Sequence, residues 1–144
     1  MIRERIKQYY RQDNLNCAIT TLKILGEKFA VPINDQVLDA AVGMHGAGGS
    51  RAQCGLVEGT LLFLGIWGRK NSLSDDDIID ACREFATTFT ARFGSLLCKE
   101  LRPEGFSPDN PPHLCEPLTC ATIIFSIEFI TECSKKYGLP TNTT

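Results

Sequence analysis

A cluster of glycines followed at once by a long apolar segment constrains this chain more than any other feature. Gly43, Gly46, Gly48 and Gly49 lie close together, and glycine readily takes the positive φ that tight loops require. Residues 53–70 then carry apolar side chains around most of the circumference of a helix. We therefore predict a glycine-rich loop that leads into a central, buried helix.

Three more glycines lie inside that apolar segment. Gly55, Gly59 and Gly65 should each destabilise a helix by about 1 kcal/mol relative to alanine. We expect a compensating benefit, namely the close approach of a neighbouring backbone.

The rest of the sequence predicts an all-α fold. Apolar residues recur at helical spacing in several further segments, and Ser74, which precedes three aspartates, is a strong helix start. We expect helices at residues 2–11, 15–30, 34–43, 74–94, 96–101 and 115–137, with Asp13 or Asn14 as the cap of the helix at 15–30. Residues 102–112, which are rich in proline, should form a loop. Residues 1–138 should form one bundle of about five to seven helices, with residues 139–144 as a flexible tail.

Length and charge exclude several classes of protein. The chain has 144 residues, of which 43% are hydrophobic, and this is enough for one core. Its formal charge of −2, without a basic cluster, argues against nucleic-acid binding. The N-terminus lacks the apolar core of a signal peptide, and the longest apolar run is too short to form a transmembrane segment. We expect a cytoplasmic protein.

Seven cysteines in such a chain point to redox chemistry, metal ligation or burial rather than to permanent disulfides. Four of them, Cys17, Cys54, Cys98 and Cys115, fall at predicted helix starts, where the helix dipole favours a thiolate. The other three, Cys82, Cys120 and Cys133, fall inside helices and are best interpreted as small buried hydrophobic residues. If the four helix starts converge, their thiols could form disulfides or hold a metal such as an iron–sulfur cluster.

The glycine-rich loop is a candidate site for a cofactor or a small anion. Its backbone N–H groups and the Arg51 guanidinium suit an anion, and the two histidines, His45 and His113, lie near candidate cysteines. The loop matches neither a dinucleotide-binding fingerprint nor a P-loop. The candidate binding residues are Gly46, Gly48, Gly49, Ser50, Arg51 and Gly55.

These cysteines and their surroundings resemble the C_GCAxxG_C_C family of redox-active proteins, over nearly the whole chain. Cys17, within Asn16-Cys17-Ala18, matches the first cysteine, and Cys115 matches the last. Cys54-Gly55-Leu56-Val57-Glu58-Gly59 matches the central motif, with Leu56 in place of its alanine, and Cys98 follows a Phe-Gly pair as in the family. The resemblance implies an all-helical bacterial or archaeal protein with a redox role. Family genes often lie beside transporter genes, which implies a membrane transporter as a possible partner.

Three interpretations stay open. In the first, Cys17, Cys54, Cys98 and Cys115 form a dithiol–disulfide or iron–sulfur site that serves an unknown redox partner. In the second, the cysteines are structural, and the chain is a non-catalytic module that binds an anion or metal and docks on a transporter. In the third, the apolar central helix forms the interface of a homodimer without a site.

Overall fold

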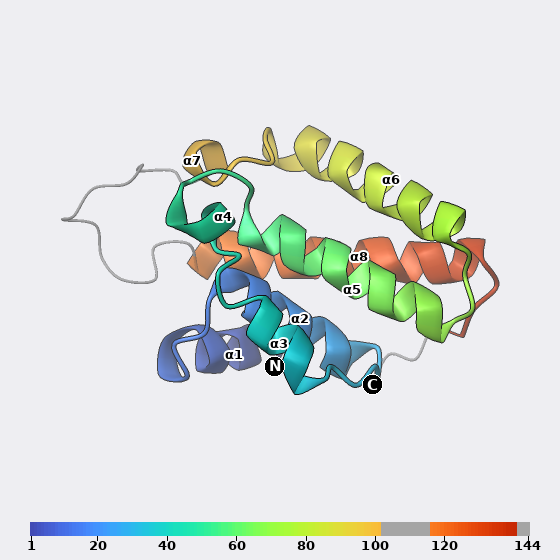
Figure 1. The fold of residues 1–144 in the computed structure, drawn as a ribbon, viewed down its shortest axis with the longest axis horizontal. Helices are drawn as coiled ribbons and strands as arrows, with labels where there is room; N and C mark the ends of the chain where they lie inside the picture. Colours follow the sequence, from blue (N-terminus) through green and yellow to red (C-terminus); the bar gives the residue numbers. More distant parts are fainter. Residues whose placement is uncertain (102–115, 141–144) are drawn as a thin grey trace.

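The computed structural model describes residues 1–101 and 116–140, and these residues form a bundle of helices (Figure 1). The prediction of an all-α fold is confirmed: the only β-type pairing in the described residues is one isolated bridge, between Gln53 and Leu97. The helices are α1 (Ile2–Lys7), the π-helix η1 (Gln8–Gln12), α2 (Cys17–Lys28), α3 (Asp35–Ala40), α4 (Gly46–Gly49), α5 (Gly55–Lys70), α6 (Asp75–Phe93), α7 (Cys98–Leu101) and α8 (Glu116–Lys136).

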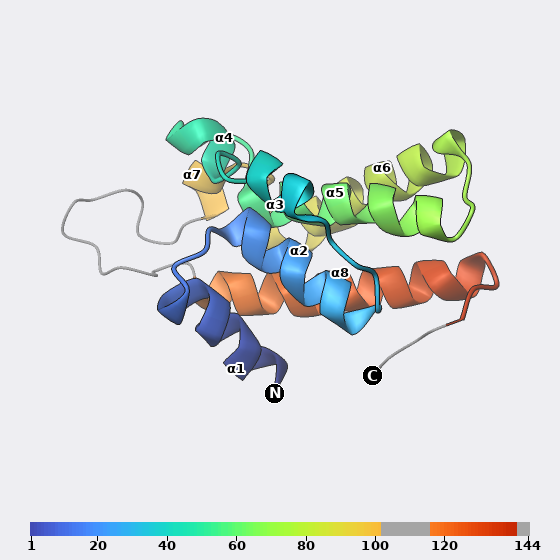
Figure 2. The same cartoon turned by 60° about the horizontal axis from the view of Figure 1, so that its bottom comes forward.

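Helix α5 is the central element. It contacts α2, α6 and α8, and Figures 1 and 2 show it between α2 and α6, with α8 running along the same bundle. Val57 and Phe63 are fully buried, and Trp67 is 3% exposed. The long apolar segment of the sequence is therefore the centre of the core, as predicted.

The glycines of α5 have different roles. A methyl group at Gly59 would lie 2.8 Å from the carbonyl oxygen of Ala18, so α2 packs directly against the backbone of α5 at this point. Gly55 is equally confined by α2, as described below. Gly65, in contrast, has no atom within 4 Å of the position of an added methyl group. The expectation of close backbone approach is thus confirmed at two of the three positions and is wrong at Gly65.

Helix α6 packs through a cluster of aromatic side chains. The Ser74 hydroxyl accepts a hydrogen bond from the Asp77 N–H at the start of the helix, and Gly94, with φ of 94°, ends it. Both ends are as predicted. Fully buried Phe85 and Phe89 contact rings from α6 and α8, with centroid distances of 4.6–6.2 Å for Phe89. The cluster consists of Phe85, Phe89, Phe93, Phe125 and Phe129.

The N-terminal segment forms a second, smaller core with α2 and α8. One helix was expected over residues 2–11, but an α-helix of six residues passes into the π-helix η1. Ile6 and Tyr9 are buried there against Ile24, Cys120 and Ile123. Tyr9 enters the core, while Tyr10, the next residue of η1, lies at the pocket described below.

Helix α8 is long and apolar enough to cross a membrane by length and composition. It is the only such helix in residues 1–101 and 116–140, and it also packs against α2 and α5. The predicted loop at 102–112 and the tail residues 141–144 lie outside the described residues. Leu139 donates its N–H to the Ser134 carbonyl over 2.7 Å, just after α8 ends.

Candidate functional site

The starts of four helices lie at one end of the bundle. Figures 1 and 2 show the N-terminal ends of α2, α5, α7 and α8 together at the left, beside α4. Residues from all of these elements line one pocket. Because helix N-termini carry a partial positive charge, this end of the molecule favours anionic groups, thiolates included.

Asn16 sets the position of Cys17. The Asn16 side-chain oxygen accepts a hydrogen bond from the Ile19 N–H over 2.8 Å, which caps α2. Its amide nitrogen donates to the carbonyl oxygens of Ala41 and Val42, at 3.1 and 2.8 Å. The expectation that Asp13 or Asn14 caps a helix beginning at Leu15 is therefore wrong, because Asn16 both caps α2 and ties it to the end of α3. Cys17 becomes the first residue of α2.

The glycine-rich loop forms a left-handed turn. The φ angles of Gly46, Ala47, Gly48 and Gly49 are 62°, 55°, 74° and 78°, a run that only glycine adopts without strain. The N–H groups of Gly48 and Gly49 donate to the carbonyls of Gly43 and His45, at 2.8 and 2.9 Å. We expected these two N–H groups to bind a ligand, but they form hydrogen bonds within the loop and stabilise it.

Two residues of this region have positive φ without being glycine. Ala47 lies inside the turn, and Arg51, with φ of 67°, follows it. Such a conformation costs roughly 1–2 kcal/mol for a residue with a Cβ atom. The surrounding hydrogen bonds hold Arg51 in place: its carbonyl accepts from the Lys99 N–H over 3.2 Å.

A short backbone pairing brings Cys54 and Cys98 together. The Cys54 N–H donates to the Leu96 carbonyl over 2.9 Å, and the Cys98 N–H donates to the Ala52 carbonyl over 2.7 Å. These bonds flank the antiparallel bridge between Gln53 and Leu97. Side chains alternate between the two faces of such a pairing. Cys54 and Cys98 therefore lie diagonally opposite each other on the same face.

Cys17 reaches the same place from α2. A methyl group at Gly55 would collide with the Cys17 Sγ atom and would lie 2.9 Å from the Met44 carbonyl oxygen. A methyl group at Gly46 would lie 3.5 Å from the Cys98 Sγ atom. Because neither glycine has a side chain, Gly55 makes room for the Cys17 sulfur and Gly46 makes room for the Cys98 sulfur. Gly55 therefore packs against Cys17.

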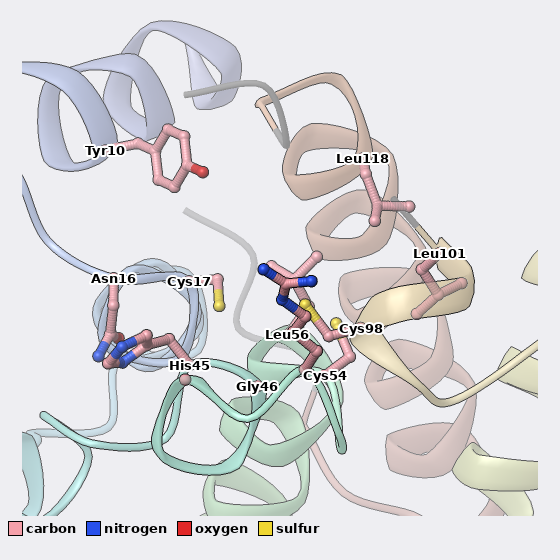
Figure 3. Close-up of a pocket in the computed structure, with 12 residues that line it drawn as sticks. Tyr10, Asn16, Cys17, His45, Gly46, Cys54, Leu56, Cys98, Leu101 and Leu118 are labelled. Carbon is pink, nitrogen blue, oxygen red and sulfur yellow. The ribbon is translucent and has the colours of Figure 1, made fainter. Parts of the chain in front are cut away.

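The sulfur atoms of Cys17, Cys54 and Cys98 line a pocket of about 400 Å³ (Figure 3). Cys54 is only 4% exposed, whereas Cys17 and Cys98 are partly exposed. Leu56, Leu101 and Leu118 supply an apolar wall, and the polar lining side chains are Tyr10, Asn16, His45 and Arg51. The arrangement presents thiols of graded accessibility to one small cavity.

The three cysteines within helices differ from this group. Cys120 and Cys133 are buried, at 4% and 6% exposure, and Cys82 is partly buried between α6 and α5. Burial raises the pKa of the Cys82 and Cys120 thiols, and it raises the pKa of Cys133 to about 11. A thiol with a raised pKa holds little reactive thiolate at neutral pH. Their interpretation as buried small residues agrees with these environments.

A metal site receives no support from the described residues. Within residues 1–101 and 116–140, no three side chains of His, Cys, Asp or Glu lie in a group that could hold a metal ion. His45 lines the pocket beside the three thiols. Cys115 and His113, the other candidates from the sequence, lie outside the described residues.

The pocket includes residues that the sequence did not single out. Of the predicted loop residues, Gly46, Gly49 and Arg51 line it, whereas Gly48 and Ser50 are exposed outside its lining. Tyr10, Leu101 and Leu118 are lining residues without a local sequence signal. Only the folded bundle brings their three helices to one end. Asn16 had such a signal, since an asparagine before an apolar helical pattern is a common cap.

Fold and site together define a helical protein whose converging helix starts carry a thiol-lined pocket. A family model described as "Putative redox-active protein (C_GCAxxG_C_C)" matches residues 15–132. The chain belongs to this family. Searches of curated proteins and of solved structures find no match.

Proposed function

We propose that this protein is a dithiol–disulfide redox protein in which Cys98 and Cys54 form the reacting pair. The observation that supports this most directly is the backbone pairing that sets the two residues on the same face at one pocket. The family's description as redox-active agrees with it.

The pairing makes Cys54 and Cys98 diagonal neighbours. Diagonal neighbours across an antiparallel pair lie roughly 7–8 Å apart, and a disulfide requires Cα atoms about 4.4–6.8 Å apart. We therefore expect disulfide formation to require an inward movement of the segment around Cys98.

Exposure assigns the order of the steps. Cys98 is partly exposed, so its thiolate attacks one sulfur of a disulfide substrate, forms a mixed disulfide and releases the first substrate thiolate. Cys54 is buried at the start of α5, where the helix dipole favours its thiolate. Cys54 then attacks the Cys98 sulfur and releases the second substrate thiolate. The substrate disulfide is reduced to two thiols as Cys54 and Cys98 are oxidised to one disulfide.

The test is to trap the mixed disulfide. The reduced protein and its Cys54→Ser and Cys98→Ser variants are treated with bis(2-hydroxyethyl) disulfide at pH 7.5, and the adducts are located by intact-mass and peptide mass spectrometry. We expect an adduct on Cys98 to accumulate in Cys54→Ser, because the resolving thiol is missing. Cys98→Ser should react at least tenfold more slowly than the wild type.

Cys120→Ser serves as the control, because Cys120 is buried and its pKa is raised. It should follow the wild-type course and form the Cys54–Cys98 disulfide. The proposal is wrong if Cys98→Ser reacts as fast as the wild type, or if Cys54→Ser still resolves its adduct at the wild-type rate.

A further inference from the structure

Among the residues that the structure describes, the charged side chains that line the pocket are of one sign. Arg51 is the only arginine or lysine among the lining residues that the structure describes, and none of those residues is an aspartate or glutamate. The remaining lining residues are thiols, leucines, glycines and neutral or weakly basic polar groups. A negative group inside the pocket would meet Arg51 and the positive ends of α2 and α5.

The backbone of Arg51 is an independent observation. Its φ of 67° is a conformation that glycine adopts without strain and arginine does not. Gly46, Gly48 and Gly49 take positive φ nearby in the same loop, and a glycine at position 51 would relieve the strain in the same way. A strained residue that lines a pocket points to a use for its side chain.

The size and shape of the pocket limit what can enter. A volume of about 400 Å³ falls in the lower part of the range typical of small-molecule sites, roughly 300–1,000 Å³. Cys54 lies at its buried side, with 4% exposure. A small linear molecule can bring its sulfur atoms to Cys98 and Cys54 here, while the wall formed by Leu56, Leu101 and Leu118 contacts its methylene groups.

We infer that the substrate is a small organic disulfide bearing a carboxylate, which binds with its anionic end at Arg51 and its sulfur–sulfur bond against Cys98. This inference rests on the proposed dithiol function. The reaction is the exchange already described: the substrate disulfide is reduced to two thiols, and Cys98 and Cys54 are oxidised to a disulfide.

A charge series of disulfides tests this. The reduced full-length protein is mixed with 3,3′-dithiodipropionate, bis(2-hydroxyethyl) disulfide or cystamine, which have similar lengths and carry negative, neutral and positive charge. Each rate constant is divided by that of 2-mercaptoethanol thiolate with the same disulfide, which removes the intrinsic reactivity. We expect the normalised rate for the dianion to exceed that for the dication by about fivefold or more, as a single charge across a pocket can provide.

Three variants assign this preference to Arg51. Arg51→Asn removes the charge but keeps a residue that tolerates positive φ, and it should abolish most of the preference. Arg51→Lys should retain it in part. Ala47→Gly is the control: it relieves the same kind of strain at an exposed residue outside the pocket lining, and it should retain the full preference.

The outcomes separate this inference from the proposed function. Equal normalised rates for the three disulfides, or faster reaction of cystamine, would overturn the substrate class while the exchange reaction stands. An unchanged preference in Arg51→Asn would overturn the role of Arg51. Failure of all three disulfides to react faster with the wild type than with Cys98→Ser would instead refute the dithiol function itself. Faster reduction of a protein disulfide, such as that of insulin, than of dithiodipropionate would also overturn the assignment to a small molecule.

Discussion

Individual residues at the pocket have more than one structural role. The Asn16 oxygen caps α2 and its amide nitrogen holds the end of α3, so one side chain fixes two elements around Cys17. Gly55 similarly serves as the first residue of α5 and as the space beside the Cys17 sulfur. Substitution at such positions should therefore affect the stability of the fold and the reactivity of the thiols together.

Asn16→Ala and Asn16→Ser separate the two hydrogen-bonding roles of Asn16. Serine can still cap α2, whereas neither alanine nor serine has the amide nitrogen that donates to the carbonyls of Ala41 and Val42. We expect Asn16→Ala to lower the free energy of unfolding by about 1 kcal/mol more than Asn16→Ser does, which is the usual contribution of a cap. Urea denaturation gives this difference. Alkylation of Cys17 by iodoacetamide should also accelerate in Asn16→Ala, because the first turn of α2 opens more often.

Equal stabilities of the two Asn16 variants would contradict a stabilising role for the cap. A matched reference is Ser74→Ala, which removes a cap at the start of α6, on a helix whose first residue does not line the pocket. It should lose similar stability without a change in the alkylation rate of Cys17.

At the scale of the elements, α2 and α5 make the most extensive contact between helices in the described bundle. Their backbones meet at Gly59 and Ala18, and the same approach continues to Gly55 and Cys17 at the pocket. The glycines of the central helix thus set the position of the site as well as the packing of the core.

Substitution of glycine by alanine in α5 should have opposite effects at two positions. Gly59→Ala would place a methyl group 2.8 Å from the Ala18 carbonyl oxygen, so we expect it to lower the free energy of unfolding by about 1–3 kcal/mol. At Gly65 the space is open, so alanine should raise the free energy of unfolding by up to about 1 kcal/mol through its higher helix propensity. Thermal and urea denaturation of both variants test this. A stabilised Gly59→Ala variant would mean that α2 and α5 do not pack as described.

Much of the fold could be predicted from the sequence, because its signals are local. Ser74, Gly94 and the aromatic stripe of α6 were recognisable from spacing and capping chemistry, and so was the buried character of α5. The cap at Asn16 was missed because Asp13, Asn14 and Asn16 all offered a cap, and the contacts of Asn16 with the end of α3 decided among them. The sequence predicted that the candidate cysteines lie at helix starts, but it did not show whether those helix starts converge. Residues 52–54 and 96–98 pair through their backbones and so bring Cys54 near Cys98. Neither segment has the alternating pattern of a strand, so the sequence did not predict this pairing.

At the scale of the whole molecule, the N-terminal segment is attached to the bundle by a polar cluster. Glu27 of α2 accepts hydrogen bonds from Arg5, at 3.1 Å, and from the Tyr9 hydroxyl. Burial and the bond to Glu27 raise the pKa of Tyr9 to about 12, so its hydroxyl remains a donor. This attachment keeps η1 and Tyr10 at the pocket, although the family match begins only at residue 15.

The contribution of Glu27 to stability should depend on pH. Burial raises its pKa, but the hydrogen bonds from Arg5 and Tyr9 outweigh this effect, so the pKa is lowered overall. A lowered pKa gives stability that is present above the ordinary value for glutamate, about 4.3, and that is lost as the pH falls through the folded-state pKa. We expect Glu27→Gln to be less stable at pH 7 by about 1 kcal/mol or less, because the side chain is 44% exposed and therefore screened.

The difference between Glu27→Gln and the wild type should shrink as the pH is lowered below about 4. Denaturation in urea across this range measures it. Glu132→Gln, at an exposed pair with Lys135 within α8, provides the comparison and should change the free energy of unfolding little at pH 7, because exposed pairs contribute little. A constant difference at all pH values would show that Glu27 contributes through packing rather than through its charge.

The bridge between Gln53 and Leu97 joins the two sides of the α5–α6 hairpin, and this links oxidation to folding. A bond between Cys54 and Cys98 would enclose the whole hairpin and restrict the unfolded chain, with a stabilisation of up to about 4 kcal/mol for a loop of this length. By the same thermodynamic cycle, the folded protein would raise the effective concentration of one thiol toward the other, and it would make the proposed pair a stronger reductant than it is in the unfolded chain. Any change that loosens the hairpin would therefore also shift the reduction potential, even at a residue far from both sulfur atoms.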